Sequence, residues 1–151
     1  MMSRRPSILI IDDDENIAKT FTAVLEKQGY SVDTAKDGGE AVRKSNTERY
    51  DVALVDIRLP DIDGIQLLTK MRKTVPKTLR IIITGYPSVQ NAIEAINKGA
   101  DGYIVKPIDP EDLLAKIKEQ LEKQGEEERY TEDKVKEYIE TRIRSLDSEE
   151  K

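Results

Sequence analysis

The feature that most constrains this chain is a set of five short runs of Ile, Val and Leu separated by segments of helical pattern. Two of these runs, Ile8–Ile11 and Ile81–Ile83, lack polar residues at alternate positions, as expected for strands buried on both faces. Buried strands that alternate with helices predict a parallel sheet covered by helices. The predicted strands are Ser7–Ile11, Ser31–Thr34, Asp51–Val55, Leu79–Thr84 and Gly102–Val105.

The segments between these runs carry apolar residues at helical spacing, which predicts a helix after each strand. Asp63 and Asp109 are placed to begin helices, and Gly29 and Gly99 are placed to end them. The pattern therefore predicts an α/β fold with a doubly wound, five-stranded parallel sheet. The apolar residues expected to share helix faces are Ile17, Phe21, Val24 and Leu25, then Ile65, Leu68 and Met71, then Val89, Ile93 and Ile96.

We expect residues 1–124 to form this domain and residues 125–151 to form a charged helical extension or a linker. The last helix of the domain, about Pro110 to Lys123, is followed by Gly125 and three glutamates. A solvated, partly frayed helix or a linker is the simpler interpretation of the extension, and dimerisation or partner docking is the alternative. Its weak apolar stripe, too short to indicate a coiled coil, comprises Val135, Ile139, Arg142 or Ile143, and Leu146.

Composition excludes several classes of function. The 151 residues contain no Cys and no His, which rules out thiol chemistry and an imidazole base within the chain. The 25 basic and 30 acidic residues give a net charge of −5, so direct nucleic-acid binding is not expected. The apolar run Ile8–Ile11 is too short for a signal peptide or a membrane span. We expect a cytoplasmic protein without membrane association.

Polar residues follow the strands at their carboxyl ends, which is where open α/β sheets bind ligands. Asp12 and Asp13 follow the first strand, Asp56 the third, Thr84 ends the fourth, and Lys106 follows the fifth. Two carboxylates at ~4 Å repel each other by about 4 kcal/mol at an effective dielectric near 20. A hard cation such as Mg²⁺, together with the Lys106 ammonium, would offset that repulsion.

This set of side chains is sufficient for phosphoryl transfer. A carboxylate can attack phosphorus to give an aspartyl phosphate, and the transfer depends mainly on positioning and charge neutralisation. A metal ion, a lysine and a hydroxyl supply both without a histidine base. Each residue alone has a simpler explanation as a helix cap, a strand residue or a surface lysine, but their occurrence together at strand ends favours a site.

Four segments resemble the motifs of response-regulator receiver domains: Ile8–Asp14, Asp56–Gly64, Ile83–Gly85 and Tyr103–Pro107. The resemblance covers about residues 7–123. It implies a CheY-like sheet with strand order 2-1-3-4-5. It also implies a cis peptide bond between Lys106 and Pro107, which X-Pro bonds adopt at modest cost.

The resemblance implies a role for each acidic residue. Asp56 would accept the phosphoryl group. Asp13, the Asp56 carboxylate and the main-chain carbonyl of Arg58 would bind Mg²⁺ or Mn²⁺, and Asp12 would assist through water.

The resemblance also implies a switch. Lys106 would hold the phosphoryl oxygens, the Thr84 hydroxyl would turn to the new phosphate, and Tyr103 would swing inward, remodelling the face between the fourth and fifth strands. Arg58 and Tyr86 are particular to this chain, and each follows a key residue by two positions. Both would lie at the rim of the site, where their bulk is expected to slow hydrolysis.

The implied function is that of a response-regulator receiver in a two-component phosphorelay. It would take a phosphoryl group from the phosphohistidine of a sensor histidine kinase or phosphotransfer protein, then bind an unidentified downstream protein, with a homodimer as one option. Such a protein is a signalling phosphoacceptor that catalyses only its own phosphorylation and slow dephosphorylation.

Four other functions compete with this one. A receiver-fold module that acts without phosphorylation, and the receiver part of a larger regulator with a missing output domain, both fit the motifs. A phosphatase of the haloacid-dehalogenase type is disfavoured, because Arg58 stands where that enzyme needs a proton-donating acid. A flavodoxin-like protein is disfavoured because the aspartates after the first strand would repel the phosphate of FMN.

Overall fold

The computed structural model describes residues 5–149 and contains two compact units, Met1–Ala115 and Lys116–Lys151. The first unit contains all the strands and the first four helices. In chain order, the elements are β1 (Ser7–Ile11), α1 (Glu15–Lys27), β2 (Ser31–Ala35), α2 (Gly38–Thr47), β3 (Val52–Asp56), α3 (Gly64–Lys70), β4 (Leu79–Thr84), α4 (Val89–Asn97), β5 (Gly102–Val105) and α5 (Pro110–Glu149).

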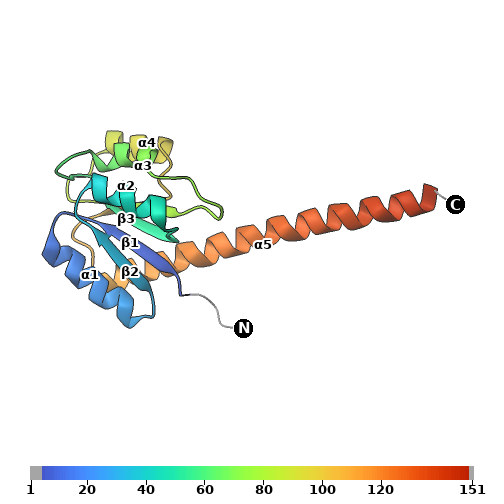
Figure 1. Cartoon of the computed structure of the whole chain (residues 1–151), viewed down its shortest axis with the longest axis horizontal. Coiled ribbons are helices and arrows are strands. Elements are labelled where there is room, and N and C mark those ends of the chain that lie inside the picture. Colours follow the sequence, from blue (N-terminus) through green and yellow to red (C-terminus); the bar gives the residue numbers. More distant parts are fainter. Residues whose placement is uncertain (1–4, 150–151) are drawn as a thin grey trace. The chain divides into compact units, whose positions relative to one another are not determined.

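The five strands form one parallel sheet in the order β2-β1-β3-β4-β5 (Figure 1), which confirms the predicted fold class and strand order. All strand bounds lie within one residue of the predicted ones. Strand β1 lies between β2 and β3 and pairs with both, so Ile11 lies opposite Ala35 on one side and Val55 on the other. The carboxyl ends of β1, β3, β4 and β5 are thereby brought to the same edge of the sheet.

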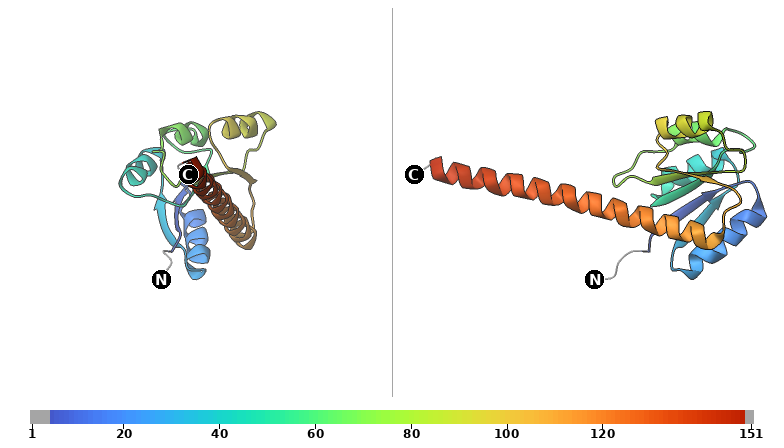
Figure 2. Two further views of the ribbon diagram at one scale, coloured as in Figure 1. Left: turned by 90° about the vertical axis from the view of Figure 1, so that its right-hand side faces the viewer. Right: turned by 180° about the vertical axis from the view of Figure 1, so that it is seen from behind.

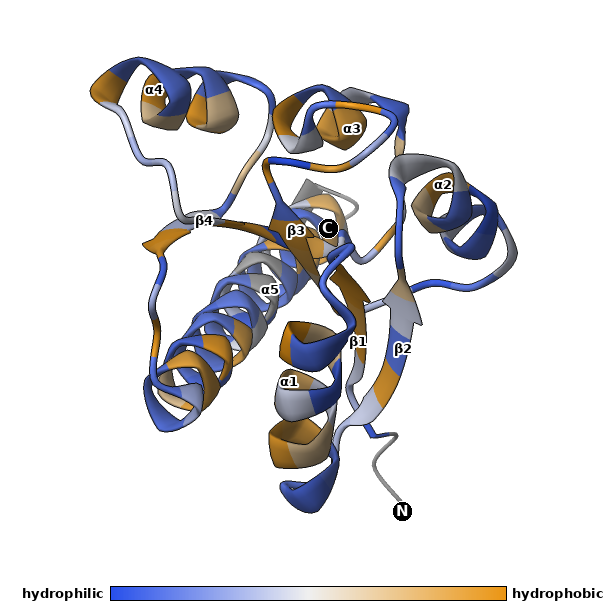
Figure 3. Cartoon of the chain, turned by 90° about the vertical axis from the view of Figure 1, so that its left-hand side faces the viewer, coloured by the Kyte–Doolittle hydropathy of each residue, from blue (hydrophilic) through white to orange (hydrophobic). Residues whose placement is uncertain are grey.

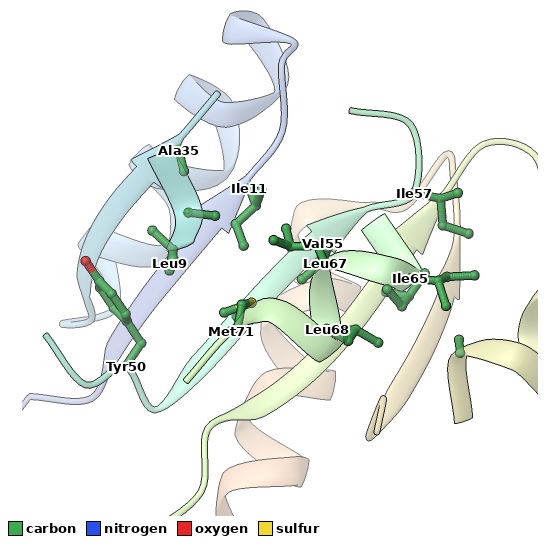
Figure 4. Close-up of a cluster of buried hydrophobic side chains, with 14 residues drawn as sticks. Leu9, Ile11, Ala35, Tyr50, Val55, Ile57, Ile65, Leu67, Leu68 and Met71 are labelled. Atoms are coloured by element: carbon green, nitrogen blue, oxygen red, sulfur yellow. The ribbon is translucent and has the colours of Figure 1, made fainter. Parts of the chain in front are cut away.

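Helices cover both faces of the sheet. Helix α1 lies on one face, and α2, α3 and α4 lie on the other (Figures 1 and 2). The inner strands β1 and β3 are mostly apolar, whereas the edge strand β2 is mixed and α1 is apolar on only part of its surface (Figure 3). Between the sheet and α3, side chains from both form a buried cluster that includes Leu9, Val55, Ile65 and Leu68 (Figure 4). Each fully buried aliphatic side chain of this kind contributes about 1.5–3 kcal/mol to stability.

Helix α4 departs from the usual amphipathic pattern. Val89, Ile93 and Ile96 share one helix face, as their spacing predicts, but they are 78%, 54% and 65% exposed. The buried residue of this helix is Ala95. Helical spacing therefore identified which residues lie together and did not identify which face packs against the sheet.

The predicted helix caps are confirmed. The Asp63 carboxylate accepts a hydrogen bond from the main-chain N–H of Ile65 at 2.7 Å, and that of Asp109 accepts one from Glu111 at 2.9 Å. Gly29 and Gly99 follow α1 and α4 with φ angles of +94° and +103°, a conformation that glycine adopts at little cost.

The last helix is longer than expected. An end near Lys123 is wrong, because α5 continues through Gly125 to Glu149. One glycine within a helix costs about 1 kcal/mol, and the good helix formers on both sides of Gly125 offset that cost. A functional boundary between residues 124 and 125 stays a prediction. Among the described residues, no helix combines the length and apolar character needed to cross a bilayer.

Gly64 is expected to be essential for the packing of α3 against β3. Its N–H donates to the carbonyl of Ile57 at 2.7 Å, and a Cβ at this position would lie 2.0 Å from the main-chain oxygen of Asp56. Gly64→Ala should therefore lower the free energy of unfolding by about 3 kcal/mol, since the obstacle is backbone. Urea unfolding followed by circular dichroism would measure it. Gly125→Ala, with no atom within 4 Å of the new Cβ, is the control that should cause no loss.

A polar network on β2 should make stability depend on pH. The Asp33 carboxylate accepts two hydrogen bonds. The Tyr50 hydroxyl donates one at 2.7 Å, and the Lys44 ammonium donates the other at 3.1 Å. Burial raises the pKa of Asp33, but these hydrogen bonds outweigh it and hold the pKa below the ordinary 3.8. Because the pKa of Asp33 is lower in the folded state than in the unfolded state, the ionised carboxylate stabilises the fold at pH values above the unfolded-state pKa. This stabilisation is lost as the pH falls through the folded-state pKa.

Asp33→Asn tests this dependence. It should cost about 0.5–1 kcal/mol near pH 7, a small value because the Asp33 side chain is 42% exposed. The difference from wild type should vanish in acid below the lowered pKa. Chemical unfolding at several pH values would measure it, and a cost that is constant with pH would contradict the assignment.

Candidate functional site

Three carboxylates meet where β1 and β3 end. Asp12 and Asp13 directly follow β1, and Asp56 is the last residue of the adjacent strand β3. Each offers one carboxylate oxygen, and the three oxygens lie within 4.8 Å of one another. Asp12 is buried, Asp56 is partly buried and Asp13 is exposed, so the cluster opens to solvent on one side.

Lys106 supplies the positive charge at this cluster. Its Nζ lies 3.3 Å from Oδ2 of Asp12 and 3.3 Å from Oδ2 of Asp56. Its main-chain N–H donates to the carbonyl of Thr84 at 2.7 Å, which holds the end of β5 beside β4. The peptide bond that follows, Lys106–Pro107, is cis, as expected. One ammonium facing three carboxylates leaves the site with excess negative charge.

The electrostatics of the site reflect that excess. Burial raises the pKa of Asp12, and the Asp56 charge adds to the shift, although the Asp14 N–H and Lys106 oppose it. Burial lowers the pKa of Lys106, but the attraction of Asp12 and Asp56 outweighs burial and raises it overall. Lys106 is therefore held in its charged form, and a further cation would relieve the remaining repulsion.

The loop between β3 and α3 folds back on itself beside Asp56. The main-chain N–H of Arg58 donates to Oδ1 of Asp56 at 3.2 Å, and Arg58 forms an isolated antiparallel bridge with Asp63. These interactions place the main chain of Arg58 next to the acceptor carboxylate. The role of its carbonyl as a metal ligand stays a prediction.

The two predicted switch residues are both engaged. Thr84 is buried at the end of β4, and its Oγ1 accepts a hydrogen bond from the main-chain N–H of Tyr86 at 2.9 Å. The partly buried Tyr103 donates its hydroxyl to Oδ1 of Asn91, in the first turn of α4. Each therefore has a defined partner in this state, and their rearrangement on phosphorylation stays a prediction.

Sequence reasoning missed a contact at the rim. The guanidinium of Arg58 lies over the Tyr86 ring, 3.5 Å from its centroid. The sequence predicts that both residues lie at the rim, but it does not predict their contact with each other. The signal was available, because β3 and β4 are neighbours in the sheet and each residue follows the end of its strand by two positions. The contact links the loop after β3 to the loop after β4.

The donor set suits a hard divalent cation. It consists of oxygen ligands, is partly open to solvent, and lacks the Cys and His that zinc sites use. Mg²⁺ is usually held by one or two carboxylates together with waters and phosphate oxygens, which fits Asp13 and Asp56 with Asp12 behind them.

Comparison with known proteins agrees with this geometry. The family model for the response regulator receiver domain matches residues 8–118. A crystal structure of a CheY-like receiver domain protein from Methanospirillum hungatei JF-1 is 44% identical with a TM-score of 0.78, covering 82% of this chain and 99% of that one. A Burkholderia pseudomallei response regulator, crystallised with a phosphorylated aspartic acid, calcium ion and citrate, is 32% identical with a TM-score of 0.67, covering 73% and 65%.

Among curated relatives, the transcriptional regulatory protein GlrR of Escherichia coli K12 is 35% identical over 122 residues. These residues are 80% of this chain and 28% of GlrR. The chain spans between 28% and 55% of the length of the curated relatives compared. Because the family model covers most of the chain and the acidic cluster and Lys106 lie at its strand ends, this protein belongs to the response-regulator receiver domains, the phosphoacceptor modules of two-component systems.

Proposed function

We propose that this chain is a Mg²⁺-dependent phosphoacceptor whose acceptor is Asp56 and whose donor is the phosphohistidine of a sensor histidine kinase or phosphotransfer protein. The arrangement of three carboxylates with Lys106 Nζ 3.3 Å from both Asp12 and Asp56 carries the proposal. The phosphorylated aspartic acid of the Burkholderia pseudomallei relative supports it.

The chemistry follows from this arrangement. An oxygen of the Asp56 carboxylate forms a bond to phosphorus while the bond from phosphorus to the donor nitrogen breaks, and the electron pair stays with the donor histidine. Lys106 stabilises the phosphoryl oxygens. A bound Mg²⁺ or Mn²⁺, held by Asp13, Asp56 and the Arg58 carbonyl with Asp12 acting through water, would neutralise charge on the same oxygens. Slow self-dephosphorylation ends the signal.

Phosphorylation would then alter the surface. It adds about −1.5 to −2 charges and three acceptor oxygens beside Thr84 and Lys106. The Thr84 hydroxyl can donate to the phosphate while it still accepts from Tyr86. Tyr103 would leave Asn91 and swing inward. The output surface lies within Thr84–Lys106, a segment that includes the exposed apolar face of α4.

We expect the downstream partner to be a protein. We do not expect residues 5–149 to bind nucleic acid directly. A receiver that acts together with an output domain is the second candidate function, because relatives such as GlrR are much longer than this chain. The complete acceptor site argues against a module that acts without phosphorylation. A cytoplasmic location and a homodimer formed through residues 125–151 stay predictions.

Phosphorylation should occur on Asp56 alone. After incubation with acetyl phosphate and Mg²⁺, intact mass spectrometry should show one added phosphoryl group in the wild type and none in Asp56→Asn, because no equivalent nucleophile remains. Chelation of the metal should prevent the reaction. Asp14→Asn is the matched control, since Asp14 follows the cluster and caps α1 through Asn16 and Ile17. Equal labelling of the wild type and Asp56→Asn would refute the assignment.

The contact between Arg58 and Tyr86 should prolong the phosphorylated state by restricting water at the rim. Exposed cation–π contacts contribute about 0.5–1 kcal/mol, which corresponds to about a two- to fivefold change in rate. Arg58→Ala and Tyr86→Ala should each accelerate dephosphorylation by about that factor, and the double variant should decay no faster than the faster single variant. Decay of the phosphorylated mass after donor removal would measure this. Lys19→Ala, exposed on α1, is the control, and unchanged lifetimes would contradict the role.

A further inference from the structure

The exposed residue Asp61 connects the loop after β3 to the start of α2. Its Oδ1 accepts a hydrogen bond from the N–H of Gly38 at 2.8 Å, and its Oδ2 accepts one from Gly39 at 2.9 Å. These are the first two N–H groups of α2, which have no partner within the helix. The two hydrogen bonds lower the pKa of Asp61, so the carboxylate is ionised at the positive end of the helix dipole.

The same helix end already has its own cap. Asp37 is the N-cap residue of α2, and its Oδ1 accepts a hydrogen bond from the N–H of Glu40 at 2.8 Å. Asp61 therefore satisfies N–H groups that Asp37 leaves free, and it does so from 22 to 23 residues away along the chain. The two carboxylates cap the same helix, but of the two, Asp61 is the one that belongs to the loop.

The contact between loop and helix is close. Gly38 is buried, and a Cβ there would lie 2.2 Å from Cγ2 of Ile62 and 3.3 Å from Oδ1 of Asp61. Ile62 packs against the buried apolar cluster beneath it. The absence of a side chain at Gly38 thus allows the loop to lie directly on the start of α2.

The loop is also held at its base. Arg58 donates its N–H to Asp56 and pairs with Asp63, and Gly64 donates to Ile57 at 2.7 Å. With the base closed by these interactions, the attachment of Asp61 to α2 fixes the tip. The main chain at Arg58, three residues from Asp61, lies between these two points of attachment.

We propose that Asp61 is a positioning residue that holds the loop after β3 in the conformation required for cation binding. The inference rests on the proposed function, in which the Arg58 carbonyl is a metal ligand. A main-chain carbonyl cannot adjust through side-chain torsions, so its position depends on the loop. Fixing the loop in advance reduces the conformational entropy lost when the ion binds.

Asp37 provides a matched control for the alternative that Asp61 merely stabilises α2. Removing either carboxylate takes one negative charge from the same helix end and leaves main-chain N–H groups without their side-chain acceptor, one for Asp37 and two for Asp61. Removal of Asp61 also releases the loop, whereas removal of Asp37 leaves the bonds from Gly38 and Gly39 to Asp61 in place. A difference in cation affinity between the two variants therefore reports on the loop and not on the charge or the helix.

Isothermal titration of the full chain with MgCl₂ tests the proposal. Loss of a group that orients a metal ligand typically weakens affinity by 10- to 100-fold, so Asp61→Ala should raise the Kd for Mg²⁺ by about 10-fold. Asp37→Ala should change it by less than about twofold, although both variants should show a lower Tm. Asp61→Asn should be intermediate, because the amide oxygen accepts from one N–H group and its NH₂ cannot replace the second acceptor.

Two results would overturn the inference while leaving the proposed function intact. These are an Asp61→Ala affinity equal to that of the wild type, or an equal loss in Asp61→Ala and Asp37→Ala. A wild-type chain that binds no Mg²⁺ would instead refute the proposed function, and this inference with it.

A second measurement needs no variant. Coupling between sites is reciprocal, so if the Asp61 contact strengthens Mg²⁺ binding, Mg²⁺ must strengthen the contact. Addition of Mg²⁺ to the wild type should therefore slow amide hydrogen exchange at Gly38 and Gly39. Unchanged exchange at saturating Mg²⁺ would contradict the inference.

Discussion

Repulsion among the carboxylates of Asp12, Asp13 and Asp56 is the constraint on which the site depends. The sheet order makes it unavoidable, because β1 and β3 are neighbours, Asp12 and Asp13 directly follow β1, and Asp56 ends β3. Lys106 offsets part of the repulsion from the end of β5, across the intervening strand β4. The apolar strands and the helices packed on them hold these charges together. The result is a site with three carboxylates and one ammonium, which is suited to a divalent cation and, with that cation bound, to a phosphoryl group.

Much of the fold could be predicted because the strands are continuous apolar runs. Periodicity placed every strand within one residue of its observed bounds, and the caps at Asp63 and Gly29 followed from local chemistry. The strand order came from the resemblance to receiver domains, since spacing carries no information about which strands pair. Local pattern was insufficient for α4, whose apolar face is exposed, and at Gly125, where neighbouring helix formers outweigh the cost of one glycine.

The site was predictable where it depends on strand ends and was missed where it depends on loops. Asp56, Thr84 and Lys106 could be placed together because parallel strands finish at one edge of a sheet. The stacking of Arg58 on Tyr86 depends on the conformations of two different loops, which sequence pattern does not specify. The hydrogen bonds from α2 to Asp61 join residues 22 to 23 positions apart, beyond the reach of local pattern. Both contacts attach the loop after β3 to a neighbouring segment. This loop is the part of the site that the sequence predicts least, and yet it is held by contacts on two sides.

A crystal structure of the full chain with Mg²⁺ and fluoroberyllate, a phosphoryl mimic, is the most direct test of whether these charges form a phosphoacceptor site. We expect a fluoroberyllate group on a carboxylate oxygen of Asp56, with Lys106 and the Thr84 hydroxyl in contact with its fluorine atoms. We also expect one metal ion bound by Asp13, Asp56 and the Arg58 carbonyl. A structure in which these carboxylates turn apart into solvent, with neither the ion nor the mimic bound among them, would contradict it.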